Sequence, residues 1–225
     1  MSFALIFMNI TKLKEKYGNE QVYVVPYVET GKIADGFKYD DKIDILSLER
    51  NGKFIYRYDA EYNEAFCQLI PYIIVVNEER DKIFVSRRIA GDERLTGSLS
   101  FFGGHINPCD SAELSVIEGA AKRELAEEVD FDPAKDTKYK VIGTVRETYS
   151  KTKEHLGIVY VVNVKDAKIR EKDILEGVWM DYDWLIKDYG RFEGWAKAII
   201  EKMFIEKRKG NKDFILKGGQ PDEHN

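Results

Sequence analysis

The chain has 225 residues, of which 44% are hydrophobic and 33% are charged. These proportions are those of a globular protein with one sizeable core, so they exclude disorder over most of the chain. The formal net charge of −5 excludes a nonspecific nucleic-acid binder, which needs a basic face against the phosphates.

The N-terminal region, residues 1–66, is predicted to be a β-rich addition. Its apolar opening, MSFALIFMNI, lacks a basic start and is too short to span a bilayer, so we expect a cytoplasmic protein without membrane association. Turn signals then separate three strand-like segments, VYVVPYV, IDILSL and KFIYRY, which predict a small antiparallel meander.

A second group of strand patterns follows the N-terminal region. A turn at NEERD separates QLIPYIIVV (68–76) from KIFVS (82–86), which predicts a β-hairpin. A further short strand is predicted at SLSFF (98–102). Cys67 and Cys109 lie far apart in the sequence, which favours two free thiols over a disulfide.

A helix is predicted from Ala112 to Val129, where the hydrophobic period changes to that of a helix and proline is absent. Asp110, followed three residues later by Glu113, resembles a capping box at its start. Apolar residues spaced four apart, Leu125 among them, form the buried stripe.

Three carboxylates lie on a neighbouring face of this helix: Glu124, Glu127 and Glu128, hereafter the box glutamates. At about 100° per residue they fall within an arc of about 100°, so they can converge on one point. Taken alone, such a stretch is more often a solvated helix face.

The rest of the chain continues the α/β pattern. Strands are predicted at YKVIGTVRET (139–148), LGIVYVVNV (156–164) and GVWM (177–180). Helices are predicted at DWLIKDY and FEGWAKAIIEKMFIEK, and residues 209–225 are expected to form a flexible tail.

The segments GGHINPCD (103–110) and AAKRELAEEVDF (120–131) together resemble the Nudix box. The Arg-Glu-aliphatic-x-Glu-Glu half matches at every defined position from Arg123 to Glu128. The chain departs from the pattern in three ways. Asp110 stands where the family has Glu, five extra residues precede Arg123, and Asp130 replaces a glycine that ends the helix. Asp tolerates the left-handed backbone expected there.

The resemblance covers roughly residues 67–190. It implies a Nudix-type α/β/α sandwich with a mixed sheet, and we expect this domain with its C-terminal helices to span residues 67–208. It also implies metal-dependent hydrolysis of a phosphoanhydride bond in a nucleoside diphosphate linked to another moiety.

Cleavage of a phosphoanhydride needs hard oxygen ligands that hold Mg²⁺ or Mn²⁺. The box glutamates are predicted to be these metal ligands. The predicted catalytic residues are Glu127, Glu128, Arg123 and Glu124. A metal ion there also supplies the positive charge that a polyanionic substrate needs in an acidic protein. The resemblance implies that Arg123 pairs with a box carboxylate and fixes its rotamer. Gly103 and Gly104 allow a sharp turn, where a carbonyl can complete the metal shell.

Further substrate contacts are predicted at strand ends and loops. Arg87 and Arg88 can hold a phosphate bidentately, and ordinary solvation is the alternative for both. His155 can act as a general base or phosphate contact, and a surface histidine is the alternative. His105 can contact the substrate, and packing within the loop is the alternative. Three aromatic rings can stack on a base or fill the core: Tyr72, Phe101 and Phe102. Three loop acids are weaker candidates for a fourth metal ligand or a general base: Glu154, Glu171 and Glu176.

Two rival functions stay open from the sequence. The first is a non-catalytic Nudix-fold module that binds or senses nucleotides, although such a module has no need for three clustered carboxylates. The second is prenyl diphosphate isomerisation, which needs an active-site cysteine, although neither cysteine lies in a motif for it. We expect specificity to lie in the loops and in the N-terminal region, and we expect the chain to be able to form a homodimer.

Overall fold

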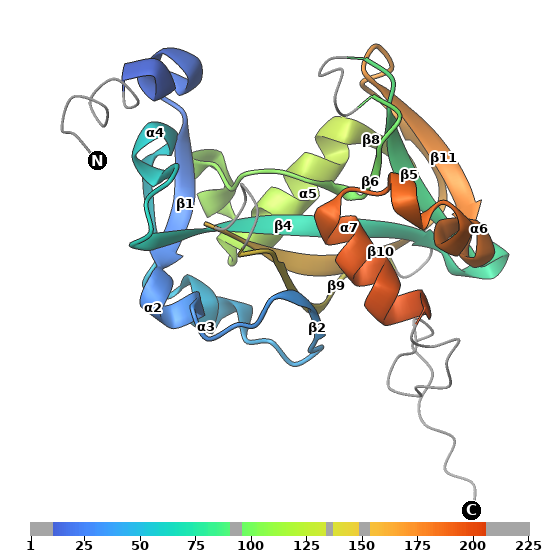
Figure 1. Ribbon diagram of the computed structural model, residues 1–225, viewed down its shortest axis with the longest axis horizontal. Helices are drawn as coiled ribbons and strands as arrows, with labels where there is room; N and C mark the ends of the chain where they lie inside the picture. The colour runs from blue at the N-terminus through green and yellow to red at the C-terminus, as the bar shows by residue number, and fades with distance from the viewer. Residues whose placement is uncertain (1–10, 91–95, 134–136, 149–153, 206–225) are drawn as a thin grey trace, which may run out of the picture. The chain divides into compact units, whose positions relative to one another are not determined.

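The computed structural model describes residues 11–90, 96–133, 137–148 and 154–205 (Figure 1). The tail predicted at 209–225 lies outside these residues. Contacts divide the chain into two compact units: the first takes the described residues of 1–73, 102–128 and 139–161, and the second takes those of 74–101, 129–138 and 162–225. The predicted α/β class is confirmed. The domain boundary after residue 66 stays a prediction.

The first unit contains the N-terminal region, the loop of residues 103–107 that begins Gly-Gly-His (the GGH loop), and the helix that carries the box glutamates. Residues 11–17 are helical. The other helices are α2 (Tyr27–Thr30), α3 (Ile45–Glu49), α4 (Arg57–Ala60), the 3-10 helix η3 (Pro108–Ala112) and α5 (Val116–Glu128). The strands are β1 (Gln21–Pro26), β2 (Gly36–Tyr39), β3 (Lys53–Tyr56), β7 (Phe102–Gly103), β9 (Tyr139–Arg146) and the first parts of β4 (Phe66–Asn77) and β10 (His155–Ile169).

Two of the three predicted N-terminal strands are confirmed. β1 pairs antiparallel with β3 and, through its other edge, with β4, and Figure 1 shows α4 beside β1. The segment IDILSL is not a strand. It forms most of α3 because the Asp44 carboxylate accepts a hydrogen bond from the backbone N–H of Ser47 at 3.0 Å, which caps a helix start.

The second unit holds the predicted hairpin. Its strands are β5 (Lys82–Arg88), β6 (Leu99–Ser100), β8 (Val129–Pro133), β11 (Leu175–Asp181) and the remaining parts of β4 and β10. Its helices are the 3-10 helices η1 (Glu78–Arg80) and η4 (Tyr189–Arg191), α6 (Tyr182–Lys187), α7 (Gly194–Ile200) and the π-helical η5 (Glu201–Ile205).

In the second unit, β5 pairs with three other strands. β4 pairs antiparallel with β5 across η1, and β5 pairs antiparallel with β11 and with β6. Asp81 makes the turn with φ 51°, a left-handed conformation that Asp tolerates. None of the described helices is both long and apolar enough to cross a membrane.

Asp130 does not end a helix in a left-handed conformation, so that expectation is wrong. It lies in β8, which pairs antiparallel with β10 and sets Asp130 opposite Lys168. Its carboxylate accepts a hydrogen bond from Arg170 at 3.0 Å, between two exposed side chains. The chain therefore passes from α5 directly into a strand at Val129, and a glycine at position 130 has no turn to serve.

Helix α5 begins four residues later than predicted. The extra residues before it fold into η3, and the backbone N–H of Glu118 donates to the Ser115 hydroxyl at 3.1 Å as the helix cap. Glu49, at the end of α3, accepts hydrogen bonds from the Ser115 hydroxyl (2.6 Å) and the Ile117 N–H (2.9 Å). The N-terminal region thus supplies a carboxylate to the positive end of α5.

Replacing Glu49 is expected to destabilise the fold. Glu49→Ala removes a charged acceptor from two donors, one of them at the helix start, and is expected to lower the unfolding free energy by about 1–2 kcal/mol. Urea denaturation measures this, with Glu79→Ala as the control because Glu79 is exposed. Equal stabilities of the two variants would contradict the cap.

Candidate functional site

The GGH loop starts at two glycines that are each required for a different reason. Gly103 has φ +150°, and a side chain on it would collide with the backbone carbonyl of Pro71 in β4. A Cβ on Gly104 would instead overlap the carboxylate of Glu124. The missing side chains therefore let the loop pair with β4 and let a box glutamate lie directly against the backbone.

The guanidinium of Arg123 lies at the centre of the site. It donates to both carboxylate oxygens of Asp110, from Nε at 2.8 Å and from Nη2 at 3.0 Å. Nη1 donates to Glu124 at 2.8 Å and to Glu127 at 3.1 Å, and Nη2 donates to the His105 carbonyl at 2.9 Å. These five hydrogen bonds match the five N–H donors of an arginine.

The charges of this cluster do not balance. One guanidinium faces the carboxylates of Asp110, Glu124 and Glu127, which leaves two negative charges uncompensated. The Asp110 carboxylate raises the pKa of Arg123 further above its usual value, and burial raises the pKa of Glu124. The excess negative charge and the all-oxygen donor set fit a hard divalent cation such as Mg²⁺ or Mn²⁺.

Asp110 has a role that the sequence pattern did not indicate. It does not cap α5. Its carboxylate is almost fully buried and also accepts a hydrogen bond from the Asn107 N–H at 2.8 Å, within the capping box of η3. Asp110 and Arg123 are thirteen residues apart, and η3 brings them together.

The box glutamates differ in exposure along α5. The Glu124 side chain is mostly covered, that of Glu127 is 56% exposed, and Glu128 is half-buried at the end of the helix. The shared contact with Arg123 brings the first two together. The assignment of the three as metal ligands stays a prediction.

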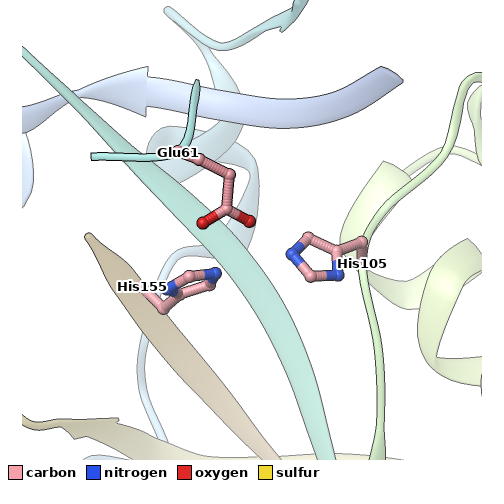
Figure 2. A group of neighbouring side chains, drawn as sticks. All are labelled: Glu61, His105 and His155. Atoms are coloured by element: carbon pink, nitrogen blue, oxygen red, sulfur yellow. The ribbon is translucent and has the colours of Figure 1, made fainter. Parts of the chain in front are cut away.

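His105 and His155, both predicted as substrate contacts, lie next to each other. Their rings meet edge to face with centroids 5.5 Å apart. The carboxylate of Glu61, which the sequence did not single out, joins them, and Figure 2 shows the three side chains pointing toward one another. Burial lowers the pKa of His105 to about 3, with further contributions from Arg57 and His155, so its imidazole is neutral at neutral pH.

Arg87 and Arg88 lie on β5 in the second unit. Arg87 is bound by Glu176 of β11, directly opposite it in the sheet, so the two predicted site residues form a surface ion pair. Arg88 is half-buried. Their contact with a substrate phosphate stays a prediction, and so does a role for Glu171, which is exposed.

The aromatic side chains considered for base stacking are core residues. Tyr72, Phe101 and Phe102 are all less than 10% exposed, and the ring of Phe101 packs against Phe192. Both cysteines are free thiols, as expected. Burial raises the pKa of Cys67, so this thiol ionises less readily than an exposed one, and Cys109 is exposed.

Removing Arg123 is expected to destabilise the protein because Asp110 is left buried without its partner. Arg123→Ala is expected to lower the unfolding free energy by about 3 kcal/mol. The double variant Asp110→Ala/Arg123→Ala is expected to lose less than the sum of the two single variants. Urea denaturation of all three gives the coupling, and strict additivity would show that the pair contributes nothing.

The two glycines are expected to respond differently to alanine. Gly103→Ala forces a strained backbone against the Pro71 carbonyl, so the unfolding free energy is expected to fall by more than about 1 kcal/mol. Gly104→Ala meets the Glu124 carboxylate, a side-chain group that can be displaced without moving the backbone, and is expected to keep the fold while weakening Mn²⁺ binding at least about tenfold. Melting temperature and Mn²⁺ titration calorimetry measure both effects. Unchanged Mn²⁺ affinity in Gly104→Ala would contradict this placement of Glu124.

Comparison with known proteins gives consistent results. The NUDIX domain model matches residues 70–203. Protein YmaB of Bacillus subtilis (strain 168) is 31% identical over 156 residues, which cover 64% of this chain and 75% of YmaB. The crystal structure of Tm1382, described as "a putative Nudix hydrolase", superposes with a TM-score of 0.68 at 25% identity, over 81% of this chain and 97% of Tm1382.

The structural match confirms the fold class predicted from the sequence, a Nudix-type α/β/α sandwich with a mixed sheet. The match to the family model begins close to the start of β4 and includes the GGH loop, Arg123 and the box glutamates. The Arg-Glu-aliphatic-x-Glu-Glu segment predicted the same relationship. The chain belongs to the NUDIX domain family.

Proposed function

We propose that the protein is a metal-dependent pyrophosphohydrolase that cleaves a phosphoanhydride bond in a nucleoside diphosphate linked to another moiety. The observation that carries this proposal is the five-bonded guanidinium of Arg123, which holds two box glutamates beside the glycine loop. Membership of the family supports a hydrolase, and Nudix hydrolases generally use divalent metals and act on small nucleotide derivatives.

The box glutamates are the residues that would hold Mg²⁺ or Mn²⁺. The ion would neutralise charge on the phosphate oxygens of the scissile bridge. Arg123 is a positioning residue, because its donors are already used by protein acceptors. We expect a box glutamate or a loop acid to accept a proton from the attacking water, and Glu127 is the most exposed carboxylate partner of Arg123.

The N-terminal region is proposed to select the substrate. An open pocket of about 780 Å³ lies in the first unit, lined by residues of 28–51 together with Thr144. Its walls carry charges of both signs: four basic side chains, Lys32, Lys38, Lys42 and Arg50, and three acidic ones, Glu29, Asp40 and Asp44. A pocket of this size suits a drug-sized polar ligand. Residues of α3 line it, and the last residue of α3 is Glu49, the carboxylate bound to the start of α5.

Removing single charges from the box glutamates tests the proposal. Glu127→Gln and Glu128→Gln preserve side-chain size and are each expected to lower kcat by at least about 10²-fold while keeping the fold. Arg123→Ala is expected to lose less activity because it disorders carboxylates without deleting one. The assay is a hydrolysis screen with Mg²⁺ or Mn²⁺ over nucleoside triphosphates, dinucleotides, nucleotide sugars and ADP-ribose.

A matched control is available on the same helix. Glu118 pairs with Lys122 at 3.1 Å outside the box motif, and Glu118→Gln is expected to leave kcat unchanged. Full activity in both box variants would show that the box glutamates are only a solvated face. Inactivity of the wild type over the whole panel would favour a nucleotide-binding module without catalysis.

A further inference from the structure

A second group of potential metal ligands lies apart from the box glutamates. It consists of Glu61, just after α4, His105 in the GGH loop and His155, the first residue of β10. One ligand atom from each lies within 4.8 Å of the others, and the side chains converge (Figure 2). Ligand atoms about 3.3 Å apart surround a tetrahedral Zn²⁺ at bond lengths of about 2.0–2.1 Å, so the three side chains must move closer together to bind the ion.

The group is largely withdrawn from water. The Glu61 side chain is 11% exposed and His155 is 8% exposed. Nε2 of His105 is buried, and among the described residues no group forms a hydrogen bond with it. A buried polar atom without a partner is costly, and a ligand for that atom removes the cost.

An arginine holds the Glu61 carboxylate in place. Arg57 donates to Glu61 at 3.2 Å and to Glu20 at 2.8 Å, so one guanidinium is shared by two carboxylates. The hydrogen bond from Arg57 orients the Glu61 carboxylate, as groups behind a metal-binding carboxylate commonly do.

We propose that Glu61, His105 and His155 form a binding site for Zn²⁺. Two imidazoles and one carboxylate are a donor set typical of zinc, whereas Mg²⁺ prefers the all-oxygen set of the box. Three protein ligands leave a position for a water molecule or a substrate oxygen. This site is independent of the proposed hydrolysis and does not require it.

The site has a structural connection to the box through His105. The His105 side chain belongs to the zinc site, while its backbone carbonyl accepts a hydrogen bond from Arg123 at 2.9 Å. Zinc bound to the imidazole therefore fixes the backbone that the box arginine uses as an acceptor. Glu61 comes from the N-terminal region, so the ion ties that region to the GGH loop.

Imidazole nitrogen resonances of the full-length wild type test the site directly. The chain has three histidines, so the ¹⁵N spectrum of the rings is simple, and His224 serves as the internal reference. One equivalent of Zn²⁺ added to chelator-treated protein is expected to shift ring nitrogens of His105 and His155 and to leave those of His224 unchanged. Unshifted nitrogens of His105 and His155 at saturating Zn²⁺ would overturn the proposal.

Cobalt substitution separates this site from the box. Co²⁺ bound by nitrogen ligands in a four-coordinate site gives strong visible absorption, which is expected in the wild type and in Glu127→Gln, and lost in Glu61→Gln and His155→Gln. Glu20→Gln is the matched control, since Glu20 also binds Arg57 but lies outside the ligand set. Absorption lost in Glu127→Gln and kept in His155→Gln would place the ion on the box and contradict the proposal. Circular dichroism checks the fold of each variant, and if a variant unfolds, the wild-type nitrogen shifts decide.

Discussion

Five hydrogen bonds from the guanidinium of Arg123 join parts of the box that are separated in the sequence. They reach Asp110 in η3, the His105 carbonyl in the GGH loop, and two glutamates on α5 itself. Because a guanidinium is planar and rigid, fixing it on the buried Asp110 also fixes where the carboxylates of Glu124 and Glu127 lie. The uncompensated negative charge of the cluster is thus held in place by the arginine.

The N-terminal region contributes to the same unit at several points. β1 pairs with β4, and the backbone N–H of Tyr23 donates to the Ile106 carbonyl at 3.1 Å, which holds the GGH loop from its other side. Glu49 binds the start of α5. This region, which carries no family motif, therefore supports the geometry of the box as well as lining a pocket of its own.

Patterns within short segments predicted much of this structure. The hairpin of β4 and β5 follows from two apolar runs around a polar turn, and the Arg-Glu-aliphatic-x-Glu-Glu segment identified both the family and the helix. The sequence patterns gave wrong predictions at two places where the same segment can adopt two backbone conformations. IDILSL alternates like a strand, but the cap at Asp44 makes it helical, and at Asp130 pairing with β10 prevails over the turn expected from the family pattern.

Contacts between distant residues could not be predicted from a single sequence. The bond between Asp110 and Arg123 depends on how the five extra residues fold, and no periodic pattern reports a 3-10 helix of that length. Glu61 lies more than forty residues from His105, in a turn of ordinary polar composition, so nothing local marked it as a partner of the two histidines. Tertiary structure alone brings such groups together.

A crystal structure with Mn²⁺, read from its anomalous difference map, tests directly whether the box glutamates bind metal. We expect a manganese peak in contact with carboxylate oxygens of the box glutamates, next to Gly104, with Arg123 still bound to Asp110. A protein that binds Mn²⁺ in solution but shows its manganese peak away from all three box glutamates would contradict this expectation.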